Sequence, residues 1–154
     1  MKLLHRNATI QLFEKAKELD AKPHDSWRCV YFNLAHQHGT YKTDLVMNFI
    51  VNPIARLLED MDGYIYLCND GDLFILFQGP VRPVINKLEY HFGNIDMTQA
   101  LEDYQQHLYS VIDLGRYWEL FYSLCEAKAR QIIRPDVAML RGYAHNRAVE
   151  ELAQ

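Results

Sequence analysis

Two apolar runs separated by a short polar turn stand out in the middle of the chain. Tyr64–Cys68 precedes the turn and Leu73–Phe77 follows it. The dipeptide Asp70-Gly71 between them suits a tight turn, because aspartate and glycine tolerate the positive φ values that such a turn requires. The pattern therefore predicts a β-hairpin. Both arms are apolar at nearly every position, which is typical of strands covered on both faces.

Apolar spacing also predicts the other elements of the first two thirds of the chain. Aromatic and β-branched residues over 27–34 are typical of a strand, whereas apolar positions three and four residues apart indicate helices. Pro53 interrupts one helical pattern, because proline lacks the backbone N–H that a helix interior uses. In chain order we expect a helix over 9–21, a strand over 27–34, a helical region over 43–60 that forms either two short helices or one helix kinked at Asn52, the hairpin, and a helix over 81–92.

The last third of the chain is predicted to be helical throughout. Apolar stripes at helical spacing run over 97–108 and 114–125, and Asp113 is the expected N-cap of the second. We therefore divide the chain into residues 1–94, a palm-type domain with an N-terminal helix, and a helical extension over 95–154, packed on the same domain. The order of elements predicts an α+β fold: a ferredoxin-like or palm-type antiparallel sheet with helices packed on it, plus the C-terminal helical extension.

Composition places the chain among ordinary soluble globular domains. Of its 154 residues, 49% are hydrophobic and 23% are charged, which is enough apolar material for a sizeable core. The formal net charge is −4 and the lysines and arginines are scattered, so we expect no nucleic-acid or membrane partner. No apolar run is long enough for a membrane span, and the N-terminal residues do not resemble a signal peptide. We expect a cytoplasmic protein.

Three cysteines lie far apart in the chain and indicate neither a disulfide framework nor a zinc site. Cys29 and Cys68 fall in predicted strands, and Cys125 lies on the apolar side of a predicted helix. We expect small buried side chains in a reducing compartment.

The segment from Arg28 to Phe92 resembles the nucleotide-cyclase palm fold, and most closely a degenerate GGDEF (diguanylate cyclase) domain. In that family a signature lies at a hairpin turn, before an apolar strand and an amphipathic helix. The corresponding positions here read Asp70-Gly71-Asp72-Leu73-Phe74. Class III adenylyl cyclases are the second choice, because Gly71-Asp72 followed by an apolar strand and Pro80 also fits their pattern. The resemblance implies a bacterial signalling domain whose two Mg²⁺ ions are held by carboxylates of the first strand and the hairpin.

This chain departs from the family at the positions that hold the metal. Asn33 stands where the family has its first metal-binding Asp, and Ala35 stands where it often has another. Leu73 replaces the Glu of the signature, and Asp70 replaces its first Gly. Asp72 alone remains, and one carboxylate with one amide holds Mg²⁺ and a triphosphate poorly. We therefore expect no metal, no cofactor, no catalytic residue and no enzyme activity.

Six residues near the ends of the two strands form the vestigial ligand pocket that the resemblance implies: Asn33, His36, His38, Asp70, Gly71 and Asp72. His36 and His38, at alternate positions, fit either a metal site or a solvated polar loop, and the lack of further ligands nearby favours the loop. Asp70 and Asp72 fit either acid–base chemistry or turn formation, and turn formation is the commoner reason for aspartate at such positions.

An aromatic-rich stretch between residues 104 and 122 offers a candidate surface. Helical periodicity assigns Tyr117, Trp118 and Phe121 to the core. Tyr109 and Tyr122 fall off that stripe, so they are the candidates for a protein interaction surface.

Three functions fit these observations. The favoured hypothesis is a catalytically inactive GGDEF-like regulatory or interaction module, whose partner is another protein or a second copy of the chain. The alternative is a sensor that binds a nucleotide or another small ligand in the surviving pocket without cyclase activity. A third hypothesis is an enzyme of unfamiliar chemistry that uses His36, His38 and Asp72.

Overall fold

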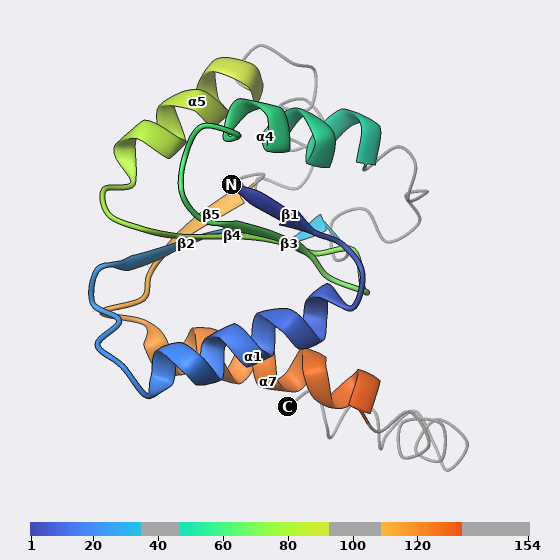
Figure 1. The fold of residues 1–154 in the computed structure, drawn as a ribbon, viewed down its shortest axis with the longest axis vertical. Coiled ribbons are helices and arrows are strands. Elements are labelled where there is room, and N and C mark those ends of the chain that lie inside the picture. The colour runs from blue at the N-terminus through green and yellow to red at the C-terminus, as the bar shows by residue number, and fades with distance from the viewer. Residues whose placement is uncertain (35–46, 93–108, 134–154) are drawn as a thin grey trace.

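A five-stranded mixed sheet lies at the centre of the computed structural model, which describes residues 1–34, 47–92 and 109–133 (Figure 1). The strands are β1 (Lys2–Leu4), β2 (Trp27–Phe32), β3 (Tyr64–Leu67), β4 (Leu73–Gln78) and β5 (Tyr109–Asp113). Their order in the sheet is β1-β3-β4-β2-β5. β1 runs parallel to β3, and the other neighbouring pairs are antiparallel.

Four α-helices of the described chain pack on this sheet, two on each face (Figure 1). On one face lie α1 (Ala8–Asp20) and α7 (Trp118–Ile133), and on the other lie α4 (Asn52–Leu57) and α5 (Arg82–Phe92). A short π-helix, η1 (Met47–Val51), leads into α4. The chain therefore has an α+β fold in three layers. Within the described ranges, no helix has the length and apolar character that a membrane crossing requires.

Alternate residues of the central strands point to opposite faces of the sheet and supply two separate cores. The core on the α4/α5 face includes Phe32, Ile65, Leu73, Ile75 and Leu88. The core on the α1/α7 face includes Leu12, Cys29, Phe74, Leu76 and Phe121. Because both faces are covered, the inner strands are apolar at almost every position, as the sequence predicted.

Strands β3 and β4 form the predicted hairpin. Gly71 at its turn has φ 98°, a value that glycine adopts without strain because it lacks a Cβ atom. The N–H of Gly71 donates to the carbonyl of Cys68 at 3.0 Å, and the N–H of Cys68 donates to the carbonyl of Asp72 at 2.8 Å. The prediction of a hairpin buried on both faces is confirmed.

Two parts of the predicted fold are wrong. Residues 109–113 form strand β5 and do not continue a helix, and Lys2–Leu4 form a strand that the sequence did not predict. Because β1 is parallel to β3, the sheet is mixed and not antiparallel throughout. Val111 and Ile112 are β-branched and fit a strand as well as an apolar helical stripe, so pairing with β2 decides their conformation.

The boundaries of the helices are partly as predicted. The short π-helix η1 is followed directly by α4, which begins at Asn52 and has Pro53 in its first turn, so this region contains two short helical elements, one of the two predicted alternatives. Helix α7 begins at Trp118, and Asp113 is the last residue of β5, not the N-cap of a helix. The helical stripe predicted over 97–108 lies outside the described residues.

Candidate functional site

The turn of the hairpin carries a carboxylate that faces the protein interior. Asp72, the residue before β4, is only 3% exposed. Its Oδ2 accepts a hydrogen bond from the hydroxyl of Tyr31 at 2.7 Å and another from Nζ of Lys128 at 2.7 Å. Tyr31 belongs to β2 and Lys128 to α7, so three elements that are distant in sequence meet at one carboxylate oxygen.

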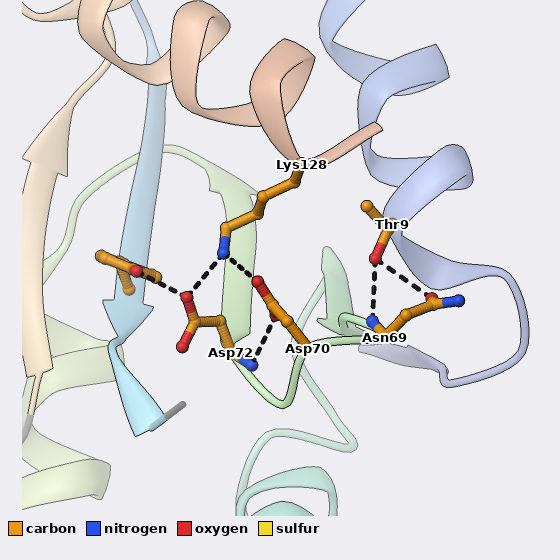
Figure 2. A network of polar contacts seen from close by, with 6 residues as sticks. Thr9, Asn69, Asp70, Asp72 and Lys128 are labelled. Atoms are coloured by element: carbon orange, nitrogen blue, oxygen red, sulfur yellow. Dashed lines mark hydrogen bonds and ion pairs between the residues drawn. The ribbon is translucent and has the colours of Figure 1, made fainter. Parts of the chain in front are cut away.

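Lys128 bridges the two carboxylates of the turn. Its ammonium forms ion pairs with Asp70 and Asp72, and Figure 2 shows the side chain reaching from α7 toward both of them. The Lys128 side chain is 11% exposed, and Nζ lies 6.0 Å from the centre of the Phe74 ring. Burial by itself would lower the pKa of Lys128, but the hydrogen bonds and charges of Asp70 and Asp72 outweigh burial and raise it. Lys128 is therefore an ammonium at neutral pH.

Tyr31 contributes a neutral hydroxyl to the cluster. Burial, followed by the hydrogen bond to Asp72 and the charges of Asp72 and Asp70, raises the pKa of Tyr31 far above its usual value of 10.0. The Tyr31 ring stacks on that of Phe74, with 4.6 Å between the ring centres. The hydroxyl therefore donates to the carboxylate and does not act as a base or a nucleophile at neutral pH.

A second set of hydrogen bonds ties the same turn to α1. The hydroxyl of Thr9 donates to Oδ1 of Asn69 at 3.1 Å and accepts from the backbone N–H of Asn69 at 2.8 Å (Figure 2). Oδ1 of Asp70 accepts the backbone N–H of Asp72 at 3.0 Å, as in an Asx turn. The turn is thus fastened to both helices of this face, to α1 through Thr9 and to α7 through Lys128.

The buried charge of Asp72 is compensated by its partners. A buried carboxylate is stable when it is paired and hydrogen-bonded, and Asp72 has both kinds of partner. General acid–base catalysis at neutral pH needs a group that titrates near neutrality, whereas Tyr31 and Lys128 titrate well above it. Within the described ranges, no group of three or more His, Cys, Asp and Glu side chains is placed to hold a metal ion. The arrangement is suited to holding α7 against the hairpin.

The structure places only some of the six predicted pocket residues. Asp70–Asp72 form the turn, and the register of β2 with β4 brings Asn33, half-buried just after β2, to the same end of the sheet. His36 and His38 lie outside the described residues. Lys128, which forms ion pairs with both carboxylates, is not among the residues predicted from the sequence.

The two predicted surface tyrosines lie on opposite faces of the sheet. Tyr109 in β5 packs against the α4/α5 core, with its ring centre 5.3 Å from that of Phe32. Tyr122 in α7 packs against the α1/α7 core, with its ring centre 5.7 Å from that of Phe13. Both tyrosines are half-buried. The structure does not bring them together in one surface.

A signal for Lys128 was present in the sequence. Lys128 follows Cys125 by three residues and Phe121 by seven, and both of those side chains are fully buried. Helical spacing therefore puts a lysine on the apolar stripe of α7, where an ammonium requires a buried partner. The stripe indicates that such a partner exists, but it does not name Asp72.

The three cysteines are buried and free, as the sequence predicted. All of them lie in the core on the α1/α7 face. Burial raises the pKa of each thiol, that of Cys68 to about 12. Thiols with so little thiolate at neutral pH are poor nucleophiles and poor metal ligands.

Comparisons of the chain with models of protein families, with curated proteins and with solved structures give no match. The assignment of function therefore depends on the residues and the geometry described above.

Proposed function

We propose that the chain is a catalytically inactive, GGDEF-like palm module that acts through protein contacts. Among the described elements, β2, α4, β3, β4, α5 and β5 follow one another in the order of a ferredoxin-like βαββαβ unit, which supports a palm. In the sheet, β2 lies between β4 and β5, and β3 lies on the far side of β4, as in such a unit. The helices α4 and α5 share one face (Figure 1). On this proposal β1, α1 and α7 are additions to the palm.

The main support for the proposed absence of catalysis is the contact between Lys128 and the two carboxylates of the turn. In the enzymes that this chain resembles, carboxylates at the hairpin hold divalent cations. Here the carboxylate of Asp72 is buried and paired with an ammonium that is tethered to α7. Mg²⁺ demands near-octahedral oxygen coordination and usually keeps several of its waters. A magnesium ion at this turn would have to displace Lys128 and find room for those waters.

Leu73 adds support for the same conclusion. It occupies the place of the signature Glu, and its side chain is fully buried in the core on the α4/α5 face. That position supplies no oxygen ligand and points away from the carboxylate of Asp72. An Asp72 site would therefore lack an oxygen ligand at the position that the signature Glu occupies in the enzymes that this chain resembles.

Turnover assays on the whole chain test the absence of catalysis. With GTP or ATP and either Mg²⁺ or Mn²⁺, we expect no pyrophosphate and no cyclic product above the level found without protein. Asp72→Asn removes the one carboxylate that remains of the metal-binding pattern of the resembled family. Asp62→Asn, at an exposed aspartate, is the matched control. Metal-dependent product that forms with the wild-type chain and with Asp62→Asn, but not with Asp72→Asn, would refute the proposal.

Thermal-shift measurements separate an interaction module from a nucleotide sensor. A ligand that binds only the folded state stabilises it by about 2.7 kcal/mol at 100 times its Kd. For an interaction module we expect no shift with GTP, ATP or cyclic dinucleotides. A saturable shift that is lost in both Asn33→Ala and Asp72→Asn would favour the sensor.

A further inference from the structure

Two aspartate–glycine steps flank strand β3. Asp62-Gly63 leads into the strand, and Asp70-Gly71 follows it at the turn of the hairpin. No other aspartate of the sequence precedes a glycine. Because glycine has no Cβ atom, its backbone nitrogen can approach the side chain of the preceding aspartate more closely than the nitrogen of any other residue. Both steps therefore have the local chemistry for a reaction between this nitrogen and the carboxyl group.

The reaction rearranges the main chain and needs only water. The backbone nitrogen of the glycine attacks Cγ of the protonated aspartate side chain, and a five-membered succinimide ring closes. The carboxyl hydroxyl leaves as water with the amide proton. Water then adds to the main-chain carbonyl carbon of the aspartate, and the bond from that carbon to the glycine nitrogen breaks. The product is isoaspartate, in which the main chain runs through the former side-chain carboxyl group and the mass is unchanged.

At Asp70-Gly71 both reacting groups are held in place. The N–H of Gly71 donates to the carbonyl of Cys68 at 3.0 Å. The carboxylate of Asp70 pairs with the ammonium of Lys128, and its Oδ1 accepts the backbone N–H of Asp72 at 3.0 Å (Figure 2). Attack on Cγ would require the turn to give up these contacts. Reaction at Asp70 therefore waits for a local opening of the hairpin turn.

At Asp62-Gly63 neither reacting group is held in this way. Asp62 is exposed, and within the described ranges its side chain forms no hydrogen bond or ion pair. The N–H of Gly63 donates to no backbone carbonyl of the described residues, whereas its carbonyl accepts the N–H of Lys2 at 3.0 Å. The side chain of Asp62 can therefore rotate toward the nitrogen of Gly63 without breaking any of the described contacts.

The position of Asp62 gives the rearrangement a structural consequence. Isoaspartate lengthens the main chain by one atom directly before Gly63. This glycine lies so close to β4 that a Cβ atom there would stand 2.8 Å from the carbonyl oxygen of Leu76. The longer main chain should therefore disturb the packing of this loop on β4 and the hydrogen bond from Lys2, which joins β1 to the start of β3.

We propose that Asp62 is the site of spontaneous isoaspartate formation in the folded chain, and that the contacts of the hairpin turn protect Asp70 from the same reaction. The local sequence makes the two steps nearly equivalent, and the fold makes them different. The proposal is independent of the function proposed above, because the reaction needs neither a partner nor a ligand.

Prolonged incubation of the whole chain at neutral pH tests the proposal. Proteolytic digestion and mass spectrometry, with chromatographic separation of isoaspartyl peptides, measure each step separately. In the native chain, isoaspartate should accumulate at least about tenfold faster at residue 62 than at residue 70, because the turn opens only rarely. In guanidinium chloride the contacts of the turn are absent, and the two rates should agree within about twofold.

Two results would refute the proposal. One is a native chain in which residue 70 reacts as fast as residue 62, or faster. The other is a native chain that has no isoaspartate at residue 62 after the time in which the unfolded chain has formed it. Because both steps lie in one molecule, this comparison needs no variant.

Lys128→Met tests the protection at the turn. It removes the ammonium that holds the Asp70 carboxylate, so isoaspartate at residue 70 should form several-fold faster, while the rate at residue 62 stays the same. Lys22→Met, at an exposed lysine, is the matched control and should change neither rate. An unchanged rate at residue 70 in Lys128→Met would show that the ammonium does not protect the turn. If Lys128→Met does not fold, the wild-type comparison still decides the proposal.

Asp62→Glu tests the structural consequence. A glutamate at this position would have to close a six-membered ring, which is much slower, so this variant should form no isoaspartate at residue 62. After incubation, the wild-type chain should contain a fraction with lowered Tm, and incubated Asp62→Glu should keep the Tm of its fresh sample. Equal losses of Tm in the two chains would contradict the consequence for the loop before β3.

Discussion

Three charged side chains form one cluster, in which the ammonium of Lys128 pairs with the carboxylates of both Asp70 and Asp72. Replacing a whole buried ion pair by apolar residues is often neutral, whereas removal of one partner leaves an uncompensated charge and costs several kcal/mol. Asp72 is more deeply buried than Asp70, so the greater cost falls on Asp72. The main effect of the cluster is therefore to fix the position of α7 on the sheet, and its net contribution to the free energy of unfolding, relative to apolar residues, is small.

Lys128→Met should lower the free energy of unfolding by about 3–5 kcal/mol, because it removes the ammonium that pairs with the buried Asp72 carboxylate. Urea denaturation followed by circular dichroism measures the loss. Lys22→Met, at an exposed lysine, is the control and should change stability by less than about 0.5 kcal/mol. In an Asp72→Asn background the effect of Lys128→Met should shrink markedly, as expected for residues in direct contact. Equal effects in both backgrounds would show that the pair contributes nothing.

Stability should also depend on alkaline pH through the same cluster. Lys128 and Tyr31 have folded-state pKa values raised above the ordinary 10.5 and 10.0, so the folded protein keeps protons that the unfolded chain loses. Their contribution is complete below about pH 10 and falls as pH rises toward the folded values. Urea denaturation between pH 8 and pH 12 should show a steeper decline in the wild type than in Lys128→Met/Tyr31→Phe. Parallel curves would contradict the assignment.

At the scale of elements, the loop that enters the hairpin passes so close to β4 that it leaves no space for a side chain at residue 63. Gly63, just before β3, has φ 145°. A Cβ atom there would lie 2.8 Å from the carbonyl oxygen of Leu76 and 3.0 Å from Cβ of Phe77. The close approach of this loop to β4 is therefore possible only with glycine.

Gly63→Ala should destabilise the fold by about 1–3 kcal/mol, because alanine adds a steric clash with backbone to the strain of a positive φ. Gly79→Ala is the matched variant: its φ is 108°, but a Cβ atom there meets nothing within 4 Å. The second variant should lose less than the first. Equal losses in thermal or urea denaturation would mean that φ strain alone accounts for both effects.

The elements differ in how far the sequence could predict them. The β3–β4 hairpin was predictable because its turn chemistry and its two apolar arms agree, and both are local signals. β5 was not predictable in this way, because Val111 and Ile112 suit a strand as well as the apolar stripe of a helix. Its conformation is decided by pairing with β2, which lies some 80 residues earlier in the chain. β1 has three residues, too few for any periodicity. For the site, the lysine on the apolar stripe of α7 indicated a buried partner, but only the folded chain pairs it with Asp72.

At the scale of the whole molecule, α7 and α1 close the face of the sheet toward which Asp72 and Tyr31 point. Trp118, Phe121 and Cys125 of α7 are all buried in the core between the helices and the sheet. Burial of this extent makes α7 part of the cooperative unit, and not a flap that opens by itself.

The three cysteines should therefore resist alkylation until the molecule unfolds as a whole. Burial raises the pKa of each thiol and also shields it from the reagent. With a maleimide at neutral pH, we expect no labelling of the native chain within the time that labels all thiols in urea. Mass spectrometry after increasing urea should show Cys29, Cys68 and Cys125 becoming reactive together. Earlier labelling of Cys125 alone would indicate that α7 detaches separately.

The distance in sequence between Asp72 and Lys128 has a consequence for how the protein is made. The two residues are 56 positions apart, so at about 5–20 residues per second a ribosome needs roughly 3–11 s to add the lysine after the aspartate. During that interval the two carboxylates of the turn lack the ammonium of Lys128, which makes their burial less favourable. We therefore expect the nascent sheet to keep one face open until the chain has reached α7, and the final collapse of that face to follow the synthesis of this helix.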